Sequence, residues 1–154
     1  MVKDSAILWY LDAIEEALCF GRIDRTVRKI DGVTVQRFSP GRKGGNRTEL
    51  NKERVRRPEK PGLMTDSGRA VLPSMGPGNF KIGAETEAEL KAARVRSKFR
   101  ALPPLYQRVR ASNLQFYRQH YPEPYRRMPA HTVEATKKGK TFGEWNDYGR
   151  LLDY

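Results

Sequence analysis

The chain has 154 residues, of which 30 are Lys or Arg and 18 are Asp or Glu, and its net charge is +12. Only 38 % of the residues are hydrophobic, so the chain can bury a small core but not a deep one. Its one cysteine, Cys19, excludes a disulfide framework and a cysteine-based zinc site, and no apolar run approaches the roughly 18 residues that span a bilayer.

Residues 4–20 are predicted to form an amphipathic helix. Asp4 or Ser5 can cap its start, and Gly21 can end it. Residues 1–24 carry a net charge of −3, so we expect the helix to contact protein rather than RNA. The apolar stripe that would dock on a neighbouring protein consists of Ile7, Leu11, Ile14 and Leu18.

Residues 25–38 are predicted to form a β-hairpin, which completes an N-terminal segment over residues 1–38. The dipeptide Asp31-Gly32 tolerates the positive φ angles of a type I′ turn, and alternating residues flank it. In that register Ile30 faces Val33, and Arg28 faces Val35. Neither face is fully apolar, and a hairpin of two strands alone is only marginally stable in water. We therefore expect the hairpin to pack against another part of the chain or a partner.

Residues 39–83 contain five prolines, many glycines and few large apolar side chains. The stretch from residue 39 to residue 61 has a net charge of +5. Such a composition is typical of chains that are disordered alone. We therefore expect a basic, extended segment with little regular structure and few contacts with the rest of the chain, held in place by partners.

Residues 84–121 are predicted to form a helical pair. Thr86 and Glu89 make a capping-box pattern for a helix over residues 86–102. The pair Pro103-Pro104 stops that helix and can start a second one, which continues to residue 121.

Residues 122–154 are predicted to be an extended tail with a short docking helix near the end. The side chains expected to dock on protein are Trp145, Tyr148, Leu151 and Leu152. The fold class that results is mainly α with one β-hairpin and long irregular extensions. Its core is small, and its extended chain is ordered by partners.

Basic residues interleave with aromatic residues in the middle of the chain, where residues 25–138 carry a net charge of +16. Arg forks pair with phosphate oxygens, and Tyr or Arg planes stack on exposed bases. A protein or lipid surface, or a purely solvated face, would explain the same charges. The expected RNA-binding residues are Arg42, Lys43, Arg47, Lys52, Arg54, Arg56, Arg57, Arg94, Lys98, Arg108, Arg110, Arg118, Arg126 and Arg127.

The motifs that could indicate catalysis are few and incomplete, and we expect no enzyme activity. Gly139-Lys140-Thr141 looks like the end of a phosphate-binding loop. Such a loop also needs a glycine at position 134, where this chain has Glu134. His120 and His131 are the only histidines, and two histidines near prolines are more often incidental than catalytic. We expect no metal, no cofactor and no small-molecule substrate.

Short helices, one hairpin and a long basic extension resemble the general style of ribosomal proteins. The stretch from Arg110 to Pro122, with Phe116-Tyr117 and His120-Tyr121-Pro122, is similar to one in a mitochondrion-specific small-subunit ribosomal protein family. This resemblance implies a structural subunit of an organellar ribosome that binds rRNA and several neighbouring proteins. It also implies a mitochondrial location, with the cytoplasm as the alternative.

A second resemblance competes with the first. Leu105-Tyr106-Gln107 looks like the Leu-Tyr-Arg motif of small mitochondrial accessory and assembly proteins, with Gln107 in place of the arginine. It implies a peripheral subunit of a respiratory or ATP synthase complex, the one reading that allows a membrane contact. A filament-lining protein on acidic tubulin is a third reading.

Overall fold

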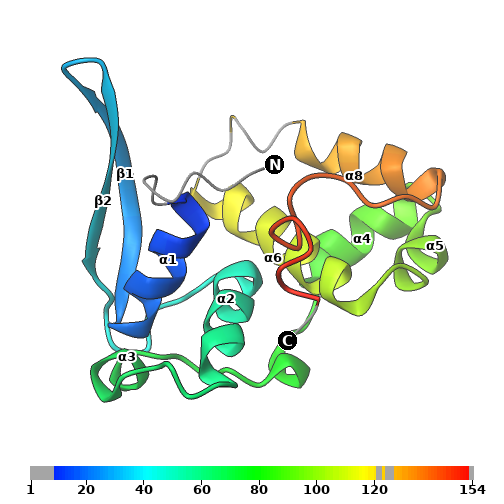
Figure 1. Ribbon diagram of the computed structural model, residues 1–154. Helices are drawn as coiled ribbons and strands as arrows, with labels where there is room; N and C mark the ends of the chain where they lie inside the picture. The colour runs from blue at the N-terminus through cyan, green and yellow to red at the C-terminus, as the bar shows by residue number, and fades with distance from the viewer. Residues whose placement is uncertain (1–8, 121–122, 124–126, 153–154) are drawn as a thin grey trace. The chain divides into compact units, whose positions relative to one another are not determined.

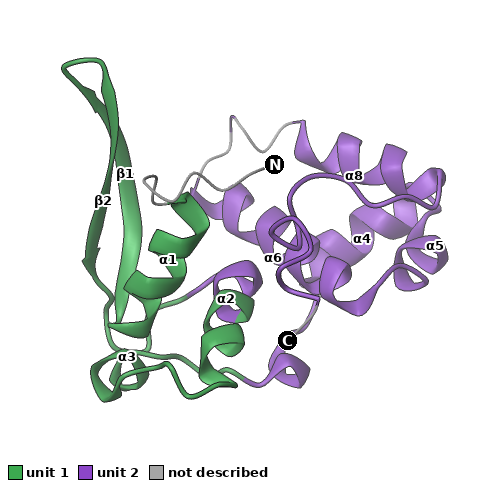
Figure 2. Cartoon of the chain, viewed as in Figure 1, with its two compact units in different colours: residues 1–46, 53–75 green, residues 47–52, 76–154 purple. Residues whose placement is uncertain are grey.

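A computed structural model describes residues 9–120, 123 and 127–152 (Figure 1). As the sequence predicts, the protein is mainly α with one antiparallel hairpin. Unit 1 comprises residues 1–46 and 53–75, and unit 2 comprises residues 47–52 and 76–154 (Figure 2). The elements are α1 (Tyr10–Cys19), β1 (Arg22–Ile30), β2 (Val33–Pro40), α2 (Glu49–Glu59), α3 (Asp66–Ala70), the 3-10 turn η1 (Pro77–Asn79), α4 (Ala84–Ala92), α5 (Arg96–Arg100), α6 (Pro104–His120) and α8 (Met128–Lys137).

The core of unit 1 gathers around α1. Ile14 and Leu18 are four residues apart, so they lie on one face of the helix, and both are buried. Cys19, Val55 and Met64 complete this hydrophobic cluster. The predicted first helix is confirmed over Tyr10–Cys19, and its predicted start at residues 4–8 lies outside the described residues.

The hairpin follows the predicted register. Ile30 faces Val33, and Arg28 faces Val35. Asp31 and Gly32 have φ angles of 49° and 80°, as a type I′ turn requires. The register shifts between Asp24 and Thr26, where a bulge adds local twist. Local turn chemistry therefore specified this element correctly.

The expectation that residues 39–83 lack regular structure is wrong, because α2, α3 and η1 lie within them. Thr48 caps α2 by accepting a hydrogen bond from the Asn51 N–H at 3.3 Å. Large apolar side chains are few in this segment, but two of them, Val55 and Met64, are almost wholly buried. Ion pairs three residues apart also support α2, and they join Glu49 to Lys52 and Glu53 to Arg56.

Helices α1 and α3 approach each other closely at Gly68. The hydroxyl of Thr65 donates to the Cys19 carbonyl at 2.6 Å and accepts from the Gly68 N–H at 3.1 Å. A Cβ atom on Gly68 would lie 2.1 Å from the Cys19 carbonyl oxygen, a distance that backbone atoms do not tolerate. A side chain at this position would therefore force the two helices apart.

We expect Gly68→Ala to destabilise unit 1 by about 3 kcal/mol, at the upper end of the usual cost of overpacking. Gly78→Ala is the matched control, because a Cβ at Gly78 would meet nothing within 4 Å. It should change stability by less than about 0.5 kcal/mol. Urea unfolding of both variants, followed by circular dichroism, measures the difference. Equal stabilities would contradict the close contact between α1 and α3.

The core of unit 2 collects apolar side chains from α4, α5 and α6. Its buried members are Leu90, Val95, Phe99, Leu102 and Tyr106. Helix α6 begins at Pro104, as predicted, and runs to His120. Partly buried side chains from other segments pack against this cluster, and they are Ile82, Ala93, Val133, Phe142 and Trp145.

The prediction of a single helix over residues 86–102 is wrong, because non-helical residues 93–95 separate α4 from α5. Arg94 takes a left-handed conformation, with φ of 56°. The Val95 N–H donates to the Leu90 carbonyl at 3.0 Å, and the Arg94 N–H donates to the Lys91 carbonyl at 2.9 Å. These two bonds make a Schellman cap, and Leu90 and Val95 supply its hydrophobic contact.

The predicted extended tail is also wrong. Helix α8 lies within it, and the buried hydroxyls of Thr132 and Thr136 donate back to the carbonyls of Met128 and Thr132. The predicted docking helix near the end is a series of turns instead. Trp145 packs edge-on against Tyr106, with ring centroids 5.4 Å apart, so the segment around Trp145 packs against the core of unit 2.

Candidate nucleic-acid interface

The hairpin and the loop after it carry a dense set of exposed cations, which we call the basic hairpin. Its seven basic side chains are opposed by two acids, Asp24 and Asp31. Asp24 accepts a hydrogen bond from the Tyr10 hydroxyl at 3.2 Å. Within the part of the chain that the structure describes, none of the seven has an ion-pair partner. They are Arg22, Arg25, Arg28, Lys29, Arg37, Arg42 and Lys43.

Both faces of the hairpin's outer half are open to solvent. Near the turn Ile30 is 55 % exposed and Val33 is 63 % exposed. They share a face with Arg28 and Arg37, because side chains alternate along each strand and register partners point the same way. Figure 1 shows that the hairpin extends well beyond the N-terminal end of α1. An uncovered two-stranded ribbon is suited to contact with a partner.

Sequence reasoning missed five of these cations, Arg22, Arg25, Arg28, Lys29 and Arg37. A signal for them was present, because neither face of the predicted hairpin was fully apolar. A hairpin without an apolar face cannot bury its basic side chains against a core. Its charges therefore had to remain exposed.

Three of the residues expected to bind RNA are buried by the chain itself, so that assignment is corrected. Arg47, Arg54 and Arg110 are each less than a tenth exposed. Arg110 donates to the Phe142 carbonyl, and its guanidinium lies 3.9 Å from the centroid of the Phe142 ring. Burial lowers the pKa of Arg110 and of Arg47. The contacts of Arg110 are therefore made inside unit 2, and its guanidinium is not available to RNA.

Five other predicted RNA contacts are paired with carboxylates of this chain. Arg57 lies 2.5 Å from Glu15, and Arg118 lies 2.5 Å from Glu85. These pairs offset part of the positive charge, and Glu49 and Glu53 do the same for Lys52, Arg56 and Arg108. The remaining predicted cations that the structure describes are exposed, and they are Arg42, Lys43, Arg94, Lys98 and Arg127. Arg126 lies outside the described residues.

The expected protein-docking stripes are mostly interior. Ile14 and Leu18 belong to the core of unit 1, and Leu151 is only 3 % exposed, so the prediction that these three dock on another protein is wrong. The same prediction is wrong for Trp145, because it packs against the core of unit 2. Leu11 is half-buried, and Tyr148 and Leu152 are exposed. Ile7 lies outside the described residues.

Groups with potential chemical reactivity are scattered. His120 packs against Phe116, whereas His131 packs against Phe142. Cys19 is buried, and burial is the main cause that raises the pKa of its thiol. Among the described residues, no cluster of three or more His, Cys, Asp or Glu side chains could hold a metal ion. No helix in the same described ranges has the length and apolar character to cross a membrane.

The fold and this interface define a small basic protein that presents an exposed β-ribbon. Residues 2–71, which include α1, the basic hairpin, α2 and α3, match a family model described as a domain of unknown function, DUF8412. The comparison with curated proteins found no match. No solved structure matched the chain either.

Proposed function

We propose that this chain is a non-catalytic, RNA-binding structural subunit of a ribonucleoprotein, with the basic hairpin as its principal RNA contact. The observation that carries the proposal is the set of seven exposed cations over residues 22–43, on a ribbon whose outer half is not covered by any other element that the structure describes. Their charge is not offset by ion pairs within the described chain, unlike that of Arg57 or Arg118.

The chemistry of these side chains favours RNA phosphates. Five of the seven strand and loop cations are arginines, whose planar forks pair bidentately with phosphate oxygens. The minor groove of an A-form RNA helix is wide and shallow, so a ribbon that carries these cations can contact phosphates and 2′-hydroxyls across it. The exposed Ile30 and Val33 at the turn can pack on sugar and base surfaces that splayed RNA loops present.

The assembly that we propose is an organellar ribosome, with rRNA and several neighbouring proteins as partners and a mitochondrial location. The resemblance of residues 110–122 to a mitochondrion-specific ribosomal protein family supports this choice. The exposed residues Tyr148 and Leu152 are the part of the predicted docking group that remains accessible to a neighbouring protein.

The test is direct binding of the full chain to a structured RNA stem-loop over a range of salt concentrations. Binding should weaken steeply with salt, by about one unit of log–log slope for each phosphate contact. Decaglutamate peptide and vesicles containing phosphatidylserine serve as alternative acidic ligands. Stronger binding to either of these than to RNA would overturn the proposal and favour the accessory-subunit or filament-lining reading.

A further inference from the structure

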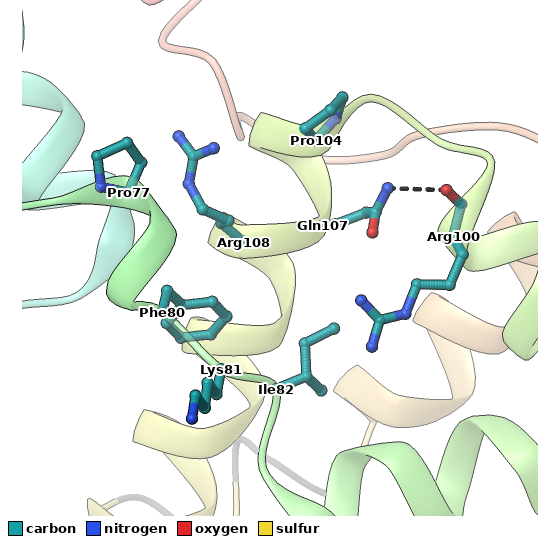
Figure 3. A pocket seen from close by; sticks show the side chains of 8 residues that line it. All are labelled: Pro77, Phe80, Lys81, Ile82, Arg100, Pro104, Gln107 and Arg108. Atoms are coloured by element: carbon teal, nitrogen blue, oxygen red, sulfur yellow. Dashed lines mark hydrogen bonds between the residues drawn. The ribbon is translucent and has the colours of Figure 1, made fainter.

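A pocket of about 410 Å³ in unit 2 combines an aromatic ring with three basic side chains. Its volume falls within the range of small-ligand sites. Figure 3 shows Phe80 and Ile82 on one side, facing the first turns of α6. The residues that line the pocket are Pro77, Phe80, Lys81, Ile82, Arg100, Pro104, Gln107 and Arg108.

Phe80 has surroundings that differ from those of the core aromatics. Phe99 and Tyr106 are wholly buried in the hydrophobic cluster of unit 2, and Trp145 packs against it. Phe80 is half-buried, lines the pocket and does not belong to that cluster among the described residues. Its ring is therefore not accounted for by core packing, and it offers an apolar π-face to an occupant of the pocket.

The cations around the ring favour an anionic group. Lys81 is exposed and has no ion-pair partner in the described chain. Arg108 also lines the pocket, but its Nε lies 3.6 Å from the Glu49 carboxylate, so this ion pair already offsets part of its charge. Arg100 is held by the Glu87 carboxylate, so its charge is already partly offset.

Gln107 supplies a fixed polar group in the lining of the pocket. Its amide nitrogen donates to the Leu102 carbonyl at 2.7 Å and to the Arg100 carbonyl at 3.0 Å. These two bonds use both N–H groups and fix the orientation of the amide. The amide oxygen then remains as an acceptor for a base N–H group, because Gln carries one acceptor and two donors.

We propose that this pocket takes one unstacked nucleotide of an RNA strand, with its base on Phe80 and its phosphate at Lys81. The inference rests on the proposed RNA-binding function and adds a second contact, which reads a single-stranded nucleotide. A base within a duplex is stacked on its neighbours and cannot enter. Single-stranded RNA is recognised in this manner elsewhere, by aromatic stacking combined with backbone charge.

The test compares Phe80→Leu, Lys81→Gln and the control Tyr148→Leu in binding to a ten-nucleotide uridine RNA and to a blunt duplex RNA. Phe80→Leu should weaken binding to the single strand by roughly ten-fold, because stacking on one base is lost, and should leave the salt slope unchanged. Lys81→Gln should reduce that slope by about one unit. Neither should alter duplex binding, and Tyr148→Leu should alter nothing. Thermal unfolding checks that each variant folds.

The outcomes separate this inference from the proposed function. If removal of basic-hairpin cations weakens binding to both RNAs and Phe80→Leu changes neither, the pocket inference is overturned and the proposed function stands. If neither set of changes affects either RNA, both fail. If decaglutamate competes for the pocket as strongly as the uridine RNA does, the site takes an acidic peptide and the nucleotide assignment is wrong.

Discussion

The triple substitution Arg28→Gln, Lys29→Gln and Arg37→Gln is expected to weaken RNA binding by roughly two orders of magnitude or more at low salt. Each charge-assisted contact contributes at least about 1.5 kcal/mol when a phosphate oxygen accepts it. The log–log salt slope should fall by about 2 to 3 units, because three counterion-releasing contacts are lost. Fluorescence anisotropy with a labelled stem-loop RNA, from 50 to 200 mM salt, measures both quantities.

A matched control removes three charges elsewhere. Lys91, Lys138 and Lys140 are exposed, lie outside the basic hairpin and do not line the pocket around Phe80. Changing all three to Gln lowers the net charge by the same amount. If both triple variants lose the same affinity and the same salt slope, RNA senses only overall charge, and the basic hairpin has no special role.

Trp145→Ala is expected to destabilise unit 2 by about 3 kcal/mol. Its indole packs edge-on against Tyr106, a ring with no exposed surface, and the substitution leaves a cavity beside it. The midpoint of thermal unfolding should fall clearly, with circular dichroism as the measurement. RNA affinity of the still-folded variant should stay near that of the unmodified chain, because Trp145 belongs neither to the basic hairpin nor to the lining of the pocket around Phe80.

Tyr148→Ala is the control for this change. Tyr148 is an aromatic side chain of the same tail, but 76 % of its surface is exposed. Its removal should change stability by less than about 0.5 kcal/mol. A stable Trp145→Ala variant would mean that Trp145 is free to dock on a neighbouring protein, as the amino-acid pattern alone indicates, and that the tail does not complete unit 2.

Elements controlled by neighbouring residues were predictable. The pair Asp31-Gly32 specified the hairpin turn and its register, because few residues adopt positive φ at low cost. Pro104 specified the start of α6, because proline lacks the N–H that an interior helical residue needs. In both cases the deciding interaction lies within a few residues along the chain.

Elements that depend on distant contacts were mispredicted. The composition of residues 39–83 predicts disorder. Val55 and Met64 nevertheless pack against α1, which is distant in the sequence, and both are buried there. Arg94 interrupts the predicted long helix because Leu90 and Val95 both join one cluster, and the Schellman cap lets them do so. Propensity alone does not report such packing.

The candidate interface divides in the same way. The sequence by itself determined that the middle of the chain is strongly basic, and this property needs no fold. Only the tertiary structure decided which cations remain available. Arg47, Arg54 and Arg110 are covered and Arg57 is paired with Glu15, whereas Arg28 stays exposed. The reason is that burial and ion pairing depend on which segments meet in space, and a formal charge carries no information about that.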